Sequence, residues 1–392
     1  MPAWGGAKRR RRIVSHLLVT NDFPPKVGGI QAYLWELWRR LDPSSFCVLT
    51  TSSHPDTPAF DAEQRSRGLR IERVSSRVLL PTPATARHIH QLVNETGASL
   101  VVLDPVLPLG LVGRSLGLPY AVVLHGAEVT VPGRLPLTRR MLASVLRRAC
   151  LVVCAGGYPA SEARRATGPR MAPVAVVPPG VDTERFRPLD PAGRVKARTS
   201  LRLPEGGPLV VSVSRLVPRK GMDVLIQAAA AMKPSFPGLT VAIGGEGRDR
   251  SRLARLVRAS GSPVRLLGRV PDDLLPLLVA AADVFVMTCR ARWGGLEQEG
   301  FGIVFLEAAA SGVPQVAGRS GGAHEAVVHE LTGLVVDDPS DPAALAAALR
   351  RLLTDDAQRL RMGEASRRRA EESFRYDLLA RRLGVALADV EV

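Results

Sequence analysis

The sequence is poor in aromatic residues and in long apolar runs, and each shortage argues against a class of function. Aromatic residues make up only 4 % of the 392 residues, which disfavours single-stranded nucleic-acid binding because that function uses aromatic stacking platforms. The longest apolar runs, such as residues 280–289, are strand-sized or carry charges and fall short of the roughly 20 residues that cross a bilayer. The basic segment Lys8–Arg12 is followed by a strand-like run instead of the apolar stretch of a secretory leader. We therefore expect a protein that is neither secreted nor membrane-spanning.

Clusters of metal ligands are also missing from the sequence. The four cysteines, Cys47, Cys150, Cys154 and Cys289, have no second Cys/His pair at zinc-site spacing, which predicts buried thiols in a reducing cytoplasm. No Asp-x-Asp motif occurs, although a metal-bound diphosphate usually needs clustered carboxylates. We expect no metal and no bound cofactor.

Positive charge is in excess. The formal net charge is +16, which favours an anionic partner such as a phosphorylated substrate, an acidic lipid or nucleic acid. The alternative is an arginine-rich composition typical of GC-rich genes. A basic nucleic-acid protein thus stays open as a rival hypothesis, although the scarcity of aromatics makes us expect no nucleic-acid partner.

Short apolar runs alternate with helical patterns along the whole chain. Strands with helical crossovers predict parallel sheets covered on both faces, and the alternation restarts after a proline-rich linker near residues 181–207. The sequence therefore predicts an α/β protein with two doubly wound, Rossmann-like domains that face a deep interdomain cleft. We expect the domains at residues 1–183 and 184–374, with a last helix at residues 375–392 crossing back to the first domain. Predicted strands include residues 13–20, 46–51, 120–125, 208–214, 264–268 and 283–289; predicted helices include residues 30–41, 222–232, 303–311 and 323–328.

Two glutamates bracket seven residues in the block G-G-L-E-Q-E-G-F-G-I-V-F-L-E. If a helix begins near Gly302, Glu307 lies on its second turn and Glu299 lies in the loop before it. The glycines before the helix are typical of a backbone that approaches a ligand closely. The alternative is a solvated helix start with capping acids.

Loops at the expected carboxyl edges of the strands hold the other candidate residues, because ligands of such sheets bind there. In the first domain these are Asn21, Asp22, Gly28 and Gly29, and also His125, which leaves a strand into a glycine turn. The Gly28–Gly29 pair is not the G-x-G-x-x-G of a nicotinamide dinucleotide site. In the second domain Arg215 and Lys220 stand at a helix entrance, where two fixed cations suit a diphosphate, and the turn around Gly268 and Val270 can hold a nucleobase through backbone groups. Plain glycine turns, a structural histidine and surface charges remain the alternatives.

Together these residues resemble a known family. The motifs T-N-D-F-P-P-x-x-G-G-I-Q, H-G-x-E, P-x-G-V-D, S-R-L-V-P-R-K-G and G-G-L-x-x-E-G-x-G-I-V-x-L-E-A-x-A-x-G are similar to those of the retaining GT-B glycosyltransferases of family GT4. The resemblance covers nearly the whole chain after residue 13 and is strongest to members that mannosylate phosphatidylinositol mannosides. One departure is His-Gly-Ala-Glu at 125–128, where those members usually have His-Gly-His-Glu, which puts the details of acceptor binding in doubt.

The resemblance implies a role for each candidate. Arg215 and Lys220 would hold the donor diphosphate, and Glu307 the ribose. Glu299 and the amides of Phe301 and Gly302 would hold the transferred sugar. Gly28 and Gly29 would approach the phosphates, Asn21 and Asp22 the acceptor, and His125 the sugar near the reacting carbon. The catalytic set is then His125, Glu299, Arg215 and Lys220, and the donor site also includes Gly268 and Val270.

The implied reaction moves α-mannose from GDP-mannose to a phosphatidylinositol mannoside with retention of configuration. We expect a cytoplasmic enzyme that sits peripherally on the anionic inner face of the plasma membrane. Two groups of residues could provide membrane contact, with core tryptophans and snorkelling arginines as the alternative. Rival functions are another GT4 reaction with a UDP-sugar or a soluble acceptor, and a UDP-sugar 2-epimerase. The first candidate membrane group is Trp35, Trp38, Arg39 and Arg40, and the second is Arg139, Arg140, Arg147 and Arg148.

Overall fold

The computed structural model of the chain describes residues 15–52 and 54–390, and the segment Lys8–Arg12 lies outside them. The first domain is built on a parallel sheet with strand order β3-β2-β1-β4-β5-β6-β7. Strands β1, β2, β4, β5 and β6 are fully buried and largely apolar, as a sheet covered on both faces requires, whereas the edge strand β3 is charged and only partly buried. The strands are β1 (His16–Thr20), β2 (Phe46–Thr51), β3 (Arg70–Val74), β4 (Leu100–Asp104), β5 (Tyr120–Leu124), β6 (Leu151–Cys154) and β7 (Val174–Val176).

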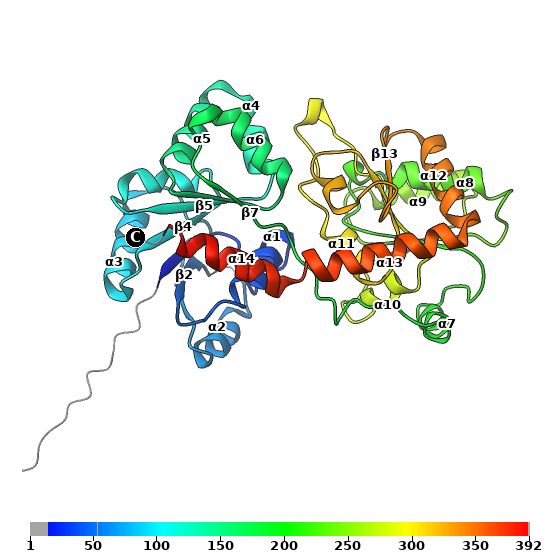
Figure 1. Cartoon of the computed structure of the whole chain (residues 1–392), viewed down its shortest axis with the longest axis horizontal. Coiled ribbons are helices and arrows are strands. Elements are labelled where there is room, and N and C mark those ends of the chain that lie inside the picture. Colours follow the sequence, from blue (N-terminus) through cyan, green and yellow to red (C-terminus); the bar gives the residue numbers. More distant parts are fainter. Residues whose placement is uncertain (1–14, 53, 391–392) are drawn as a thin grey trace, which may run out of the picture.

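Helices on both faces of this sheet complete the first domain (Figure 1). One apolar layer packs beneath the helices of one face and a second beneath those of the other, with Val102 and Val123 in one layer and Val101 and Val122 in the opposite one. This alternation follows from the twofold side-chain period of a strand. The helices are α1 (Gly29–Trp38), α2 (Thr57–Ser66), α3 (Pro83–Thr96), α4 (Ala127–Arg134), α5 (Pro136–Arg148) and α6 (Gly157–Thr167), with the 3₁₀ turn η1 (Leu109–Ser115).

The second domain repeats the design on a parallel sheet with order β10-β9-β8-β11-β12-β13. The prediction of two doubly wound α/β domains is therefore confirmed. Its strands are β8 (Leu209–Val213), β9 (Thr240–Gly244), β10 (Val264–Gly268), β11 (Val284–Met287), β12 (Gln315–Gly318) and β13 (Gly333–Val336). Its helices are α7 (Pro191–Ser200), α8 (Met222–Met232), α9 (Arg250–Ser260), α10 (Leu275–Ala280), α11 (Ile303–Ala310), α12 (Pro342–Thr354) and α13 (Asp356–Ser373), with short turns η3 (Pro218–Lys220), η4 (Trp293–Gly295) and η5 (Ala323–Ala326).

Two chain crossings join the domains. The first is the segment after β7, and the second is the junction between α13 and α14 (Tyr376–Ala388), which Figure 1 shows running from one domain onto the other. The crossings touch, because the Val181 amide donates to the Phe374 carbonyl at 2.8 Å. Helix α14 packs beside α1 and buries Leu379 and Leu383 in the core of the first domain.

Some expected elements differ from the structure. The predicted linker at 181–207 contains α7, whose N-cap Asp190 accepts a hydrogen bond from the Gly193 amide at 2.6 Å. The helix expected at 323–328 is only the 3₁₀ turn η5. The polar helix α2 was not anticipated.

The first candidate membrane group is wrong. Trp38 is fully buried and its indole N–H donates to His16 Nε2 at 2.9 Å. Trp35 packs edge-on against Phe60, and Arg39 and Arg40 both pair with Glu36. Helix α1 therefore serves the core rather than a bilayer. Within residues 15–52 and 54–390, no helix combines the length and the apolar character needed to span a membrane.

The four cysteines form no disulfide. Three of the thiols are buried, as expected, and burial raises the pKa of Cys289 and Cys154 to about 12. Cys150 is only half-buried and its thiol donates to the Tyr120 carbonyl.

Candidate active site in the interdomain cleft

A cavity of about 710 Å³ lies between the two domains. Loops that follow β1 and β5 of the first sheet meet loops that follow β8 and precede α11 of the second, so the cavity lies at the carboxyl edges of both sheets. Its size is within the range of small-molecule sites. The predicted residues that line it are Gly28, Gly29, His125, Arg215, Lys220, Glu299, Phe301 and Gly302.

A buried ion cluster forms the second-domain floor of the cavity. Lys220, at the end of η3, places its Nζ 2.7 Å from Glu299 Oε2, and Arg219 pairs with the same carboxylate. Burial alone would raise the pKa of Glu299, but Lys220 and Arg219 outweigh it and hold that pKa below its usual range. Glu299 is therefore ionised, and it fixes both cations at the floor.

Sequence reasoning missed Arg219 as a cavity residue. The signal was present, because Arg219 lies beside Lys220 in the motif S-R-L-V-P-R-K-G. The turn is fixed by Gly221, whose φ is +71° and where a Cβ would lie 2.1 Å from the Thr288 carbonyl oxygen. Only glycine allows this approach.

Arg215 differs from these two cations because it is exposed at the cavity wall. Among the residues that the structure describes, its guanidinium makes no hydrogen bond or ion pair. Glu297 also lies 3.8 Å from Arg219, but it is shared with Arg248 and Arg292. Cations therefore outnumber carboxylates at this floor, which suits a diphosphate.

Glu307 lies on the second turn of α11, as expected, but not among the residues that line the cavity. Its side chain is partly buried, and its carboxylate makes no hydrogen bond or ion pair within the described part of the chain. Burial raises its pKa to about 7, which the charge of Arg185 opposes and that of Asp272 reinforces. The helix starts at Gly302, whose φ is +86° and where a Cβ would lie 2.9 Å from the ring of Phe305. The predicted ribose contact of Glu307 stays a prediction.

On the first-domain side, His125 belongs to a chain of buried polar groups. Its Nε2 lies 2.7 Å from Asp104 Oδ1, and the hydroxyl of Thr20 donates to Asp104 Oδ2 at 2.6 Å. The ring of Tyr33 meets the imidazole edge-on at 5.3 Å. Burial would lower the pKa of His125, but the charge and hydrogen bond of Asp104 outweigh it and raise that pKa above its ordinary value.

Asp104 and Thr20 were not recognised in the sequence. They end the neighbouring strands β4 and β1, where they face each other in the parallel register. Each of the two residues ends an apolar run of the sequence, and strand order was needed to use this signal.

The first-domain loop uses Asn21 for its own structure. The side-chain Nδ2 of Asn21 donates to the Leu79 carbonyl at 3.1 Å, and its Oδ1 accepts from the Leu79 backbone amide at 2.7 Å. Asp22 pairs with Lys26 at 3.0 Å and accepts from Gln31. Neither Asn21 nor Asp22 lines the cavity, so their acceptor contacts stay predictions.

Gly268 and Val270 also lie outside the cavity lining. The Gly268 carbonyl accepts from the Gly245 amide at 2.6 Å, and Val270 packs so close to Gly244 that a Cβ there would lie 2.6 Å from its methyl group. These contacts shape the ends of β9 and β10. The nucleobase contact expected of Gly268 and Val270 stays a prediction.

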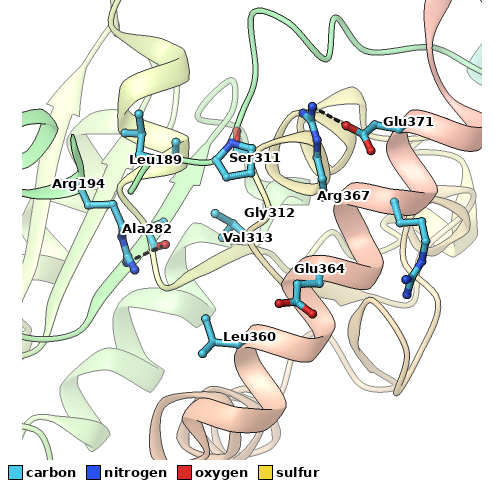
Figure 2. A pocket seen from close by; sticks show the side chains of 13 residues that line it. Leu189, Arg194, Ala282, Ser311, Gly312, Val313, Leu360, Glu364, Arg367 and Glu371 are labelled. Atoms are coloured by element: carbon cyan, nitrogen blue, oxygen red, sulfur yellow. Dashed lines mark hydrogen bonds and ion pairs between the residues drawn. The ribbon is translucent and has the colours of Figure 1, made fainter. Parts of the chain in front are cut away.

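Within residues 15–52 and 54–390, no group of three or more His, Cys, Asp or Glu side chains is placed to hold a metal ion. A second hollow, of about 380 Å³, lies between the chain before α7 and helix α13 (Figure 2). Two of its three arginines are already engaged, because Arg194 pairs with Asp283 and Arg367 with Glu371, each at 2.6 Å. This hollow is a seam between packed elements.

The two sheets and the charged cleft define a glycosyltransferase with the GT-B architecture. Residues 194–369 match the family described as "Glycosyl transferases group 1", and residues 27–185 match "Glycosyltransferase Family 4". The chain belongs to glycosyltransferase family 4.

Named relatives match over almost their full length. A GDP-mannose-dependent alpha-(1-6)-phosphatidylinositol monomannoside mannosyltransferase of Mycobacterium tuberculosis is 41 % identical over 375 residues, which cover 94 % of this chain and 96 % of the relative. A GDP-mannose-dependent monoacylated alpha-(1-6)-phosphatidylinositol monomannoside mannosyltransferase of Corynebacterium glutamicum is 36 % identical, with the same coverage. The HepE protein of Anabaena, solved with UDP, has a TM-score of 0.79 at 21 % identity and covers 96 % of this chain and 100 % of its own, which supports the fold.

Proposed function

We propose that this chain transfers an α-mannosyl group from GDP-mannose to phosphatidylinositol monomannoside with retention of configuration. The observation that carries the proposal is the full-length similarity to relatives named for this reaction, at 41 % identity over 94 % of the chain. The cationic cleft floor supports it, because a nucleoside diphosphate must be bound there and then released as an anion. The rival GT4 reactions keep the same fold and differ in donor or acceptor.

The second domain supplies the groups for the donor. Arg215, whose guanidinium pairs with none of the described residues, offers a fork to the diphosphate, and Lys220 and Arg219 add two cations that Glu299 holds in place. As the sugar–phosphate bond breaks, negative charge grows on the leaving diphosphate. Preorganised cations then stabilise the transition state more than the ground state.

The chemistry needs no separate general base. The bond from the anomeric carbon to the phosphate oxygen breaks with its electron pair on the phosphate, and the acceptor oxygen attacks from the same face. The proton of the acceptor hydroxyl passes to the departing phosphate oxygen. His125, positioned by Asp104 at 2.7 Å, lies across the cavity and would bind the transferred sugar.

The reaction is tested by mass spectrometry of lipid products after incubation with GDP-mannose and phosphatidylinositol carrying zero, one or two mannoses. We expect a new dimannoside from the monomannoside and little product from the other two. A parallel series with UDP-sugars tests the nearest rival. Transfer from UDP-sugars but not from GDP-mannose contradicts the proposal. Transfer to a soluble acceptor only also contradicts it.

We also propose that donor binding needs no metal ion. Arg215, Arg219 and Lys220 supply the positive charge that a divalent cation would otherwise bring to the diphosphate. Transfer should continue at the same rate after dialysis against EDTA. A loss that Mg²⁺ or Mn²⁺ restores contradicts this.

The acceptor is a lipid, and we propose that the enzyme reaches it peripherally at the anionic inner face of the plasma membrane. The second candidate membrane group supports this, because Arg139, Arg140, Arg147 and Arg148 line one hollow of about 620 Å³ along α5. At the start of the same helix Leu137 is 71 % exposed. Apolar anchors beside clustered cations suit an anionic bilayer.

Vesicle sedimentation tests this surface. The double variant R140S/R148S should bind phosphatidylinositol vesicles more weakly than the wild type at low salt. The control R350S/R361S removes the same charge from exposed positions on the second domain and should bind as the wild type does. Equal loss in both pairs would indicate net charge rather than a surface.

A further inference from the structure

A carboxylate of the second domain caps a helix of the first. Glu325, on η5, accepts a hydrogen bond at Oε2 from the Gly157 amide at 2.7 Å, and its Oε1 accepts from the Tyr158 amide. These two N–H groups open α6, and the first amides of a helix have no partner within it. The start of α6 has no acidic residue in its first turn and no side-chain cap of its own. The missing cap therefore comes from the other domain.

Charge strengthens the contact. The N-terminus of a helix carries a partial positive charge, and hydrogen bonds to an ionised carboxylate are stronger than neutral ones. Among the described residues Glu325 forms no ion pair, so α6 is the partner of its charge. The hydrogen bond to Tyr158 is half-buried, which limits competition from water, whereas the one to Gly157 is exposed.

The first domain leaves room for this carboxylate. A Cβ at Gly156 would lie 2.9 Å from Glu325 Oε2 and 3.4 Å from the ring of Phe301. The backbone of Gly156 is extended, with φ 162° and ψ 174°, so the requirement for glycine is steric. Gly156 lets two second-domain residues approach at once.

The turn that carries Glu325 is also hydrogen-bonded to the loop that contains Glu299. The Gly322 amide donates to the Glu299 carbonyl at 2.9 Å, and the Glu325 amide donates to the Gly322 carbonyl at 3.0 Å. The next residue after Glu299 touches the first domain, since a Cβ at Gly300 would lie 2.7 Å from the His125 carbonyl oxygen. Two backbone hydrogen bonds thus connect Glu325 to the loop of Glu299 and Gly300, and this loop lies against the backbone of His125.

The turn is braced from behind by α13. Arg369 donates to the Ala326 carbonyl at 2.7 Å and to the Glu325 carbonyl at 3.1 Å, and its guanidinium stacks on Phe374. Phe374 lies at the second crossing between the domains and packs beside Phe301. The backbone of Glu325 is therefore held, and its carboxylate is the part that reaches across.

We propose that Glu325 is a positioning residue that latches the domains together. The latch consists of the Glu325 carboxylate and the amides of Gly157 and Tyr158. It sets the spacing between His125 and the segment Glu299–Phe301, which complete the site only when both domains are in place. The kinetic consequence rests on the proposed function, whereas the domain contact does not.

The test compares E325A and E325Q with E330Q, a matched control on the surface five residues further on. E325A should lower kcat by about tenfold to a hundredfold with little change in the Kd for GDP, because the diphosphate groups are on one domain. E325Q retains one acceptor oxygen for two amides and should fall between. E330Q should behave as the wild type.

Small-angle X-ray scattering with saturating GDP measures the latch without any transfer. The radius of gyration should be larger for E325A than for the wild type and E330Q, with the melting temperature lowered only by the few degrees that loss of a helix cap costs. Equal radii overturn the proposal whatever the rates, and so does a larger radius with an unchanged kcat when the wild type transfers mannose. If the wild type transfers no mannose and E325A nevertheless has the larger radius, the proposed function is refuted and the latch is not.

A first-domain variant provides an independent check. G156A places a methyl group against the Glu325 carboxylate and should reproduce the slow, expanded state of E325A. Because both changes break one contact, the double variant E325A/G156A should be no slower than the slower of the two single variants. Rates that multiply would overturn the proposal.

Discussion

Replacing Asp104 by Asn should reveal how His125 is held. The carboxylate of Asp104 is 1 % exposed and uses both oxygens, one for His125 Nε2 and one for the Thr20 hydroxyl. Asn has one acceptor oxygen in place of two, so His125 Nε2 and the Thr20 hydroxyl can no longer both donate to this residue. One hydrogen bond is therefore lost together with the charge that supports a protonated imidazole.

The cost follows from the loss of a buried, charge-assisted hydrogen bond, which is about 2 kcal/mol. For a domain of this size, that lowers the melting temperature by roughly 4–8 °C. Because Asp104 raises the pKa of His125 above its unfolded value, the pair stabilises the fold fully below about pH 6.5. This stabilisation is lost as the pH rises through the raised folded pKa.

Thermal melts of the wild type and D104N between pH 5.5 and 9 measure both effects. The difference in melting temperature should be largest at the acidic end and shrink towards the alkaline end. Transfer rates should also fall in D104N, since His125 loses its fixed orientation. A difference that is constant across this range, or absent at pH 5.5, would refute the assignment of a charged His125–Asp104 pair.

Three further substitutions separate the groups of the donor side. K220A removes the Nζ that lies 2.7 Å from Glu299 and should lower kcat by about 10²–10³-fold, as loss of a transition-state charge contact does; a near-normal rate of GDP-mannose transfer would contradict the assignment. In the wild type the KM for the donor should fall as the pH rises through about 7, where Glu307 ionises, and E307Q should lack this pH dependence. Because burial raises the pKa of Glu307 from 4.5 to about 7, stability is lost as the pH rises between these two values, and E307Q should melt higher than the wild type at pH 8 but by little at pH 5. G302A forces a side chain onto a φ of +86° and should cost about 1–3 kcal/mol, with weaker GDP binding by titration calorimetry; unchanged binding and melting would show that the helix start tolerates a Cβ.

Much of the fold could be predicted because buried strands and amphipathic helices leave periodic patterns. Strands β2 and β10 and helix α8 have the bounds that their apolar runs indicate. Helix α2 escaped because its mean composition is polar and only Thr57 and Gln64 are buried. Helix α7 was hidden by the prolines around it, although Asp190 and Pro191 form an ordinary helix start.

Residues of the site were predictable where one motif contains them and not where the fold brings distant residues together. Lys220 and Glu299 were found through their motifs, but their contact across 79 positions could not be predicted from the sequence. Thr20 and Asp104 pair across two strands separated by 84 residues. Trp38 stayed a candidate for membrane contact, with a core tryptophan as the alternative, because α14, which packs against α1, comes from the far end of the chain.

The two glutamates of the E-x7-E block show most clearly what the sequence leaves open. In the sequence they are the same residue type on either side of one helix start, and either could bind a cation or a hydroxyl. In the structure Lys220 and Arg219 lower the pKa of Glu299, whereas burial raises the pKa of Glu307 to about 7. Environment sets the roles of paired carboxyls, so Glu299 stays charged and fixes the cations of the floor. Glu307 changes its protonation state near neutral pH, and donor binding should follow that change while the ion cluster around Glu299 does not.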